Sequence, residues 1–155
     1  MQSHRSRPGY RALFDPGRGR RPVPVTGGLH IVIVEDDILI AMDVAELLTE
    51  LGHDVCATVR TEADAVAAAE RCRPDLMIVD GQLDEGGGIS AMRQILAKSE
   101  VAHLYITGDR RRLMQQVPDA VILEKPFSLS ELLNGIDAAL LGTGRPKREA
   151  LGKSN

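Results

Sequence analysis

The sequence predicts an α/β protein with a doubly wound, five-stranded parallel sheet and helices on both faces. Short continuous runs of β-branched and aliphatic residues recur along the chain, which is typical of strands buried on both faces of a parallel sheet. Segments with apolar residues at helical spacing alternate with these runs. Right-handed crossovers between parallel strands then leave only a few possible strand orders.

Five apolar runs are the expected strands. Each is short, and each is bounded by glycine, proline or charged residues, which favour turns. In chain order, the runs are 30–34, 55–59, 76–79, 102–106 and 120–123.

Five helices are expected to follow the strands. The first has an apolar face and ends at Gly52, which suits the position after a helix C-terminus. Thr61 and Ser128 are each followed three residues later by an acidic residue, a capping-box pattern that predicts helix starts. The last helix is expected to end at Gly142. Of the remaining two helices, one follows the glycines at 86–88 and the other, a weak helix, covers residues 110–116.

The folded domain is expected to cover residues 30–141. Residues 1–29 contain four prolines, several glycines and no apolar periodicity, so we predict a disordered basic extension. Residues 142–155 form a flexible basic tail by the same reasoning. Neither segment is long enough for a DNA-binding or catalytic output domain.

Charge is distributed unevenly along the chain. The extension carries six arginines against one acidic residue, whereas residues 30–141 hold 20 acidic and nine basic residues. A cluster of carboxylates that binds a divalent cation would explain the acidic body, and an acidic surface that keeps the protein soluble is the alternative. The basic ends lack an aromatic pattern and an amphipathic face, so we expect neither a nucleic-acid partner nor a membrane.

The two cysteines, Cys56 and Cys72, give neither metal-ligand spacing nor a disulfide framework. We therefore predict that both are reduced and structural. The chain also lacks an apolar run of membrane-spanning length and a signal-peptide pattern. Together these features predict a cytoplasmic protein.

Polar residues stand at the ends of four expected strands. Glu35 and Asp36 follow the first strand, Asp80 the third, Thr107 the fourth and Lys125 the fifth. Ligands of open α/β sheets bind beyond the carboxyl ends of the strands. A single such residue is usually a turn former or helix cap, but several acids with one hydroxyl and one cation at the same edge form a much narrower pattern.

Clustered carboxylates repel one another unless a cation neutralises them. Oxygen ligands with open water positions suit Mg²⁺, which also bridges to phosphate oxygens. A carboxylate in such a site can act as a nucleophile towards a phosphoryl group, and a lysine and a hydroxyl can stabilise the transferring oxygens. The pattern therefore predicts phosphoryl chemistry at Asp80.

The region from about His30 to Leu141 resembles a response-regulator receiver domain. The motifs that carry the resemblance are Ile-Val-Glu-Asp-Asp at 33–37, Pro-Asp-Leu-Met-Ile-Val-Asp at 74–80, Ile-Thr-Gly at 106–108 and Glu-Lys-Pro-Phe at 124–127. The resemblance implies a flavodoxin-like fold with strand order 2-1-3-4-5. It also implies a bacterial two-component phosphorelay, in which a histidine kinase or histidine phosphotransfer protein supplies the phosphoryl group and an unknown downstream protein is the target.

The resemblance also implies a role for each site residue. Asp80 is the phosphorylated residue, and Thr107 and Lys125 contact the phosphoryl group. Mg²⁺ is held by Asp36, by Asp80 and by the backbone carbonyl of Gln82, while Glu35 either acts on it through water or orients Lys125. The protein is then not an enzyme but a phosphoryl-accepting signalling domain that catalyses only its own phosphorylation and dephosphorylation. The bond between Lys125 and Pro126 is often cis in relatives.

Two departures from the family pattern affect the expected switching. The family usually has an aromatic switch residue three positions before the lysine, where this chain has Ile122. The loop after Asp80 lacks the common Met-Pro pair. With Tyr-Ile-Thr-Gly at 105–108, these features resemble a subgroup of single-domain regulators with a Phe-Ala-Thr-Gly type motif. We expect the signal to leave through residues 108–117, with the last helix completing the partner face.

Three alternatives remain open at this stage. A hydrolase of the haloacid dehalogenase type needs a second acid two residues after its nucleophile, where this chain has Gln82. A degenerate receiver that binds partners without phosphorylation would not need the acidic residues, Thr107 and Lys125. A nucleic-acid-binding protein would use the basic ends, and its affinity would fall steeply with salt.

Overall fold

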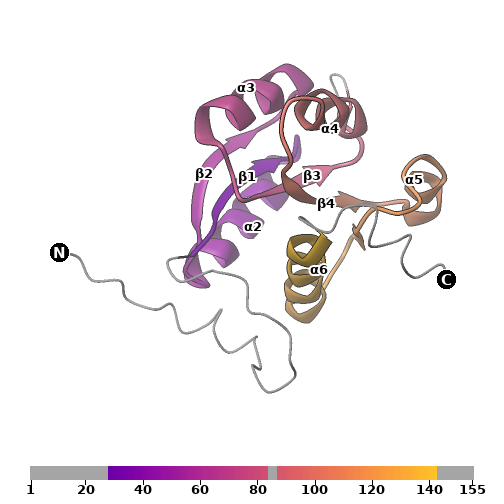
Figure 1. Ribbon diagram of the computed structural model, residues 1–155. Coiled ribbons are helices and arrows are strands. Elements are labelled where there is room, and N and C mark those ends of the chain that lie inside the picture. Colours follow the sequence, from indigo (N-terminus) through magenta and orange to yellow (C-terminus); the bar gives the residue numbers. More distant parts are fainter. Residues whose placement is uncertain (1–27, 84–86, 143–155) are drawn as a thin grey trace, which may run out of the picture.

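Five parallel strands form one sheet in the order β2-β1-β3-β4-β5 (Figure 1). The computed structural model describes residues 28–83 and 87–142. The predicted fold class and strand order are confirmed. The strands are β1 (His30–Val34), β2 (Asp54–Val59), β3 (Leu76–Asp80), β4 (Ala102–Thr107) and β5 (Ile122–Glu124).

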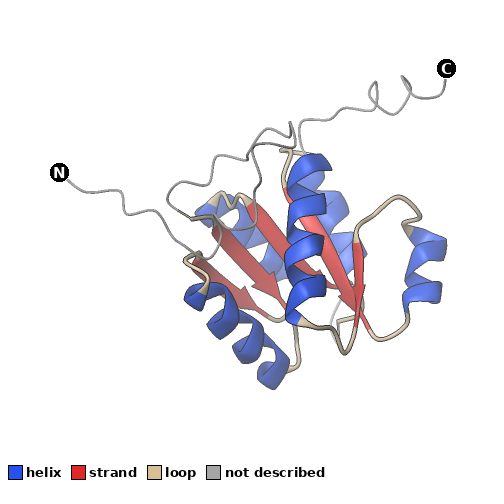
Figure 2. Cartoon of the chain, turned by 90° about the horizontal axis from the view of Figure 1, so that it is seen from below, coloured by secondary structure: helices blue, strands red, loops and turns tan. Residues whose placement is uncertain are grey.

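Helices cover both faces of the sheet (Figure 2). Val32 and Val34 pack with apolar residues of three helices on one face, and Ile31 and Ile33 pack with residues of the other two on the opposite face. The helices of the first face are α3 (Glu62–Cys72), α4 (Gly88–Leu96) and α5 (Arg110–Gln116). Those of the second are α2 (Ile38–Glu50) and α6 (Leu129–Gly142). Burial of β1 on both faces explains why its sequence is continuously apolar.

The predicted helix caps are present. Thr61 accepts a hydrogen bond from the backbone N–H of Asp64. Ser128 and Glu131 form both halves of a capping box, because each side chain accepts from the backbone N–H of the other. Gly52 adopts a left-handed backbone with φ of 96° directly after α2, a conformation that glycine adopts at little cost.

The register of the strands places their carboxyl ends side by side. Val34 is paired with Val79, Asp80 with Ile106, and Thr107 with Glu124. The last residues of β3 and β4 therefore lie at the same edge as the residues that follow β1 and β5. This alignment builds the site described below.

The fifth strand begins later than predicted, at Ile122 instead of residue 120. The N–H of Ala120 donates to the carbonyl of Val117, so the chain is still turning there. Pairing with β4 starts only when Ile122 comes opposite Tyr105. The apolar composition of 120–123 indicated a strand but contained no signal for this turn.

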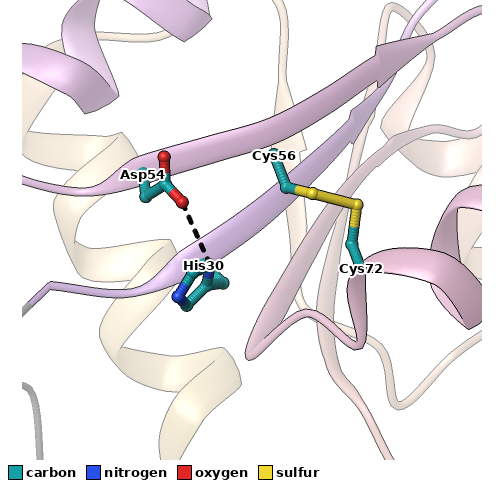
Figure 3. Close-up of a disulfide and its surroundings, with 4 residues drawn as sticks. All are labelled: His30, Asp54, Cys56 and Cys72. Carbon is teal, nitrogen blue, oxygen red and sulfur yellow. Dashed lines mark ion pairs between the residues drawn. A yellow bond between two sulfur atoms is a disulfide. The ribbon is translucent and has the colours of Figure 1, made fainter.

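The prediction of two reduced cysteines is wrong, because Cys56 and Cys72 form a disulfide (Figure 3). Cys56 lies in β2 and Cys72 is the last residue of α3. The helix returns across the edge of the sheet and brings the two Cα atoms to 6.3 Å, within disulfide range. Their separation of 16 residues in sequence gave no indication of this proximity.

The proposed terminal extensions lie almost entirely outside the described residues, which begin at residue 28 and end at residue 142. At the boundary, Leu29 is buried in the core, and its N–H donates to Nδ1 of His53. The folded part therefore includes Leu29, which the sequence had assigned to the extension. Within the described ranges, no helix has the length and apolar character that crossing a bilayer requires.

Candidate functional site

Four strand ends bring the predicted site residues together. Asp80 ends β3 and Thr107 ends β4, while Glu35 directly follows β1 and Lys125 directly follows β5. Glu35, Asp80 and Thr107 are buried, and the side chain of Lys125 is 24% exposed. The parallel arrangement explains the meeting, because all strands of such a sheet point their carboxyl ends the same way.

Three carboxylates form what we call the acidic cluster: Glu35, Asp36 and Asp80. Each offers one oxygen, and these oxygens lie within 4.8 Å of one another. Asp36 is half-buried and gives the cluster a side that faces solvent. Hard oxygen donors at this spacing, with an open side for water, fit the ligand preferences of Mg²⁺.

Lys125 supplies the positive charge beside the cluster. Its Nζ lies 3.2 Å from Oδ2 of Asp80 and 3.3 Å from Oε1 of Glu35. One ammonium group thus contacts two buried carboxylates. The bond from Lys125 to Pro126 is cis, as the resemblance implied.

The surroundings of the cluster shift two pKa values. The pKa of Glu35 is raised from 4.5 to about 7, first by burial and then by the Asp80 side chain, while the N–H of Asp37 and the charge of Lys125 act to lower it. Burial alone would lower the pKa of Lys125, but Asp80 and Glu35 outweigh it and raise that pKa. Glu35 therefore holds a proton more firmly than an ordinary glutamate, chiefly because it is buried and secondarily because Asp80 lies beside it.

The loop after Asp80 is tied closely to its strand end. The N–H of Gly81 donates to the carbonyl of Ile106 at 2.9 Å, and the N–H of Gln82 donates to Oδ1 of Asp80 at 2.8 Å. Gln82 was predicted to offer its carbonyl, and its observed backbone contact is through the N–H. The side chain of Gln82 is exposed.

Helix α4 begins against the same strand end. A Cβ on Gly88 would lie 2.0 Å from the backbone oxygen of Asp80 and 2.9 Å from a methyl of Val79. Only glycine permits so close an approach. The N-terminus of α4 is thereby fixed beside Asp80.

Thr107 is 2% exposed and faces the loop that follows it. Its Oγ1 accepts a hydrogen bond from the N–H of Asp109 at 3.0 Å, and its carbonyl accepts from the N–H of Lys125 at 2.8 Å. Asp109 in turn caps α5 by accepting from the N–H of Arg112. Thr107 thus links the site to the start of α5.

Two contacts of α5 were not predicted from the sequence. Arg110 donates from Nη1 to the carbonyl of Ile122 at 2.9 Å. Leu113 packs so closely on Gly81 that an added Cβ there would lie 2.9 Å from its Cδ1. Ile122 itself is buried with Leu113. These contacts depend on how α5 docks, for which the sequence contains no local signal.

An exposed apolar surface adjoins the site at the start of α2. Its members Ile38, Leu39 and Met42 are 57%, 69% and 60% exposed. Asp37, which caps α2 through its side chain, connects this surface to the acidic cluster. Only the buried face of this helix was predicted from the sequence, although the three apolar residues outside that face were a usable signal.

Comparison with known proteins agrees with this geometry. The family model described as the response regulator receiver domain matches residues 31–137. The chain is similar to the transcriptional regulatory protein PdtaR of Mycobacterium tuberculosis, with 35% identity over 115 residues, 72% of this chain and 56% of the relative. It is also similar to the phyllosphere-induced regulator PhyR of Methylorubrum extorquens, with 37% identity over 72% of this chain and 43% of the relative.

Solved structures show the same fold. The receiver domain of Erythrobacter litoralis PhyR, at 33% identity, gives a TM-score of 0.70 and covers 77% of this chain and 95% of that one. The anti-anti-sigma factor PhyR of Bartonella quintana, at 30% identity, gives 0.67 and covers 83% and 52%. The chain spans about half the length of the curated relatives it matches. From the family match and the shared fold, the chain belongs to the response regulator receiver domain family.

Proposed function

We propose that this receiver accepts a phosphoryl group on Asp80 in a bacterial two-component phosphorelay. The observation that carries the proposal is the contact of Asp80 with Lys125 at 3.2 Å inside the acidic cluster. A buried carboxylate at a strand end, next to one ammonium group and two further acids, suits nucleophilic attack on phosphorus.

The proposed chemistry assigns one task to each side chain. An oxygen of Asp80 attacks the phosphorus, a new O–P bond forms, and the bond to the leaving group of the donor breaks. In this proposal, Lys125 and the hydroxyl of Thr107 stabilise the oxygens of the transferred group. Thr107 would then exchange its present contact with the N–H of Asp109 for one with the phosphoryl group.

Mg²⁺ is the proposed cofactor, held by Glu35, Asp36, Asp80 and the carbonyl of Gln82. When bound, it would neutralise charge on the phosphoryl oxygens. The geometry of the acidic cluster supports this assignment, because three carboxylates offer oxygens within 4.8 Å of one another and Lys125 is the ammonium group that contacts two of them. The N–H of Gln82 donates to Oδ1 of Asp80, which holds the backbone of Gln82 beside the cluster and supports its inclusion in the proposal.

The proposed donor is a histidine kinase or a histidine phosphotransfer protein of the cytoplasm. Such a donor must bring its phosphohistidine to the edge that carries Asp80, and the exposed residues Ile38, Leu39 and Met42 offer an apolar contact surface there. A downstream protein would then recognise the phosphorylated state. The named relatives include a transcriptional regulatory protein and an anti-anti-sigma factor, both of which are regulators.

Intact-mass spectrometry tests the proposal directly. The protein is incubated with Mg²⁺ and acetyl phosphate, and we expect the mass of one phosphoryl group to be added. Asp80→Asn should abolish the adduct. The control is Asp75→Asn, near the opposite end of β3, where the side chain contacts the N–H of His30. An adduct that persists in Asp80→Asn would refute the assignment, and an unlabelled native protein would favour a receiver that works without phosphorylation.

A further inference from the structure

The Cys56–Cys72 disulfide lies at an accessible edge of the molecule. Cys56 is exposed on β2, which is the edge strand of the sheet. Cys72 is half-buried at the end of α3. Figure 3 shows the bond spanning from the strand to the helix end, next to the ion pair of His30 with Asp54. A soluble thiol can therefore reach the Cys56 sulfur without unfolding the domain.

A permanent disulfide would be unexpected in the cytoplasm, the compartment of the proposed phosphoryl donor. In a reducing cytoplasm, disulfides of mesophilic proteins are usually transient and serve catalysis or redox sensing. The exposed position is also that of a labile bond and not of a protected structural one. Arg71 and Arg73 flank Cys72 in sequence, and positive charge near a thiol favours the thiolate form.

The fold does not depend on the bond alone. Ala65 and Ala68 anchor α3 in the core, and Thr61 and Arg73 cap its two ends. The strand β2 is paired with β1 along its length. Opening the disulfide therefore releases one restraint on α3 while its packing remains.

Helix α3 is connected to the loop after Asp80 through Glu62. The Glu62 carboxylate accepts hydrogen bonds from the N–H of Gly87, the hydroxyl of Ser90 and the side-chain amide of Gln94. These three groups lie at the beginning and in the middle of α4, whose first residue, Gly88, is packed against Asp80. A shift of α3 would thus be felt at the loop that carries Gln82.

We propose that the Cys56–Cys72 disulfide is a reversible thiol–disulfide exchange site, whose closed form restrains α3 and, through Glu62, the loop after Asp80. The second half of this proposal rests on the proposed function, and the first half does not. The closed form holds the start of α4 in place beside Asp80 through the contact of Glu62 with Gly87, so reduction is expected to slow phosphorylation of Asp80.

The exchange is balanced by a small dithiol as reductant. One thiolate of the reagent attacks the Cys56 sulfur, a mixed disulfide forms, and Cys72 leaves as a thiolate. The second thiol of the reagent then displaces Cys56. Two electrons and two protons pass to the protein, and the reagent becomes a disulfide. A low-molecular-weight disulfide, such as oxidised glutathione, reverses the process.

Alkylation of the full-length protein tests the exchange. The chain has two cysteines, so every thiol signal comes from this site. We expect no alkylation before treatment, two alkyl groups after native incubation with dithiothreitol, and none again after oxidised glutathione. The far-ultraviolet circular dichroism spectrum should remain that of the folded protein throughout. Free thiols in the untreated protein, reduction only in denaturant, or failure to reclose would overturn the proposal.

Phosphorylation by acetyl phosphate and Mg²⁺ tests the coupling. Reduced protein and the Cys56→Ser/Cys72→Ser variant should share a rate about two- to tenfold below that of the oxidised protein, since positioning is impaired but not lost. In Glu62→Gln the difference between oxidised and reduced forms should shrink, whereas Glu46→Gln, on the opposite face, should keep it. Equal rates in the oxidised and reduced native protein would overturn the coupling. Absence of any phosphorylation would instead refute the proposed function and leave the exchange result standing.

Discussion

Asp36 is the least buried member of the acidic cluster and gives the clearest test of metal binding. Without Asp36, the cluster keeps Glu35 and Asp80, and Lys125 already forms ion pairs with both of these carboxylates. We expect Asp36→Ala to weaken Mg²⁺ binding by about tenfold or more, because oxygen ligand count and charge set affinity for this ion. Isothermal titration calorimetry, or a titration followed by nuclear magnetic resonance, measures the affinity for Mg²⁺. Asp43→Ala on the exposed side of α2 is the control, and equal affinities in the two variants would show that the cluster does not bind the ion.

Glu35 should make the metal-free protein less stable at higher pH. Its pKa is raised from 4.5 to about 7 in the folded protein. Between these values the folded state holds a proton that the unfolded state releases, so stability is full below about pH 4.5 and declines as pH rises through about 7. The decline should be on the order of 1–3 kcal/mol.

Chemical denaturation in a chelating buffer across this pH range checks the prediction. Glu35→Gln cannot ionise and should lose this part of the decline, while Glu46→Gln should retain it. Addition of Mg²⁺ to the native protein at pH 8 should restore stability, because a ligand that binds only the folded state stabilises it. A native protein that gains stability from pH 4.5 to 7 without metal would contradict the expected proton uptake.

At the level of elements, the start of α4 is fixed by backbone contact with β3. The Cβ added in Gly88→Ala would lie 2.0 Å from the backbone carbonyl oxygen of Asp80, so the helix or the strand end must shift. We expect a loss of about 1–3 kcal/mol in stability, together with slower phosphorylation. Gly87→Ala is a close control, since its Cβ would meet nothing nearer than 3.9 Å. Urea denaturation compares the two, and similar stabilities would mean that the approach relaxes without cost.

Helix α5 is the element that we expect to transmit the signal. Asp109 caps this helix and its N–H donates a hydrogen bond to Thr107. Arg110 donates a hydrogen bond to the carbonyl of Ile122, and Leu113 packs on Gly81. Phosphorylation must favour one of two states by different contacts, and about 5.5 kcal/mol would move the population from 1:99 to 99:1. Since Ile122 has no ring to turn inward, the Arg110 contact is a candidate readout in its place.

Amide hydrogen exchange with Mg²⁺ and beryllofluoride measures this readout. Protection should change in residues 108–117, and Arg110→Ala should reduce that change. Arg111→Ala, whose side chain is exposed, should leave it intact. Changes confined to residues 81–83 and 87–88 would place the route of the signal elsewhere.

For the whole molecule, the disulfide alters the unfolded chain as well as the folded one. It joins residues 16 apart, and closing a loop of this size in the unfolded state is worth about 3 kcal/mol in the chain-entropy model. We expect reduction to lower the free energy of unfolding by about 2–4 kcal/mol. Urea denaturation of oxidised and reduced protein measures this, with the Cys56→Ser/Cys72→Ser variant matching the reduced form. Identical midpoints would indicate that the reduced chain loses no such restraint.

The sheet, its helices and the site residues at the carboxyl ends of the strands could all be predicted from the amino-acid sequence. Strands buried on both faces must be continuously apolar, and caps such as Ser128 with Glu131 are local hydrogen bonds. Asp80 and Lys125 could be placed together for the same reason, because parallel strands bring all their carboxyl ends to one edge.

The contacts of the helices with the sheet and with one another could not be predicted from the sequence and became known from the three-dimensional structure. Three of these contacts join residues at least 12 positions apart in the sequence. They are the Cys56–Cys72 disulfide, the hydrogen bonds of Glu62 with α4 and the hydrogen bond of Arg110 with Ile122. Local periodicity reports which side of an element is buried, but it does not report the distance between two elements. Those distances follow from the packing of whole side-chain layers, so the contacts that tune this receiver appear only once the core has formed.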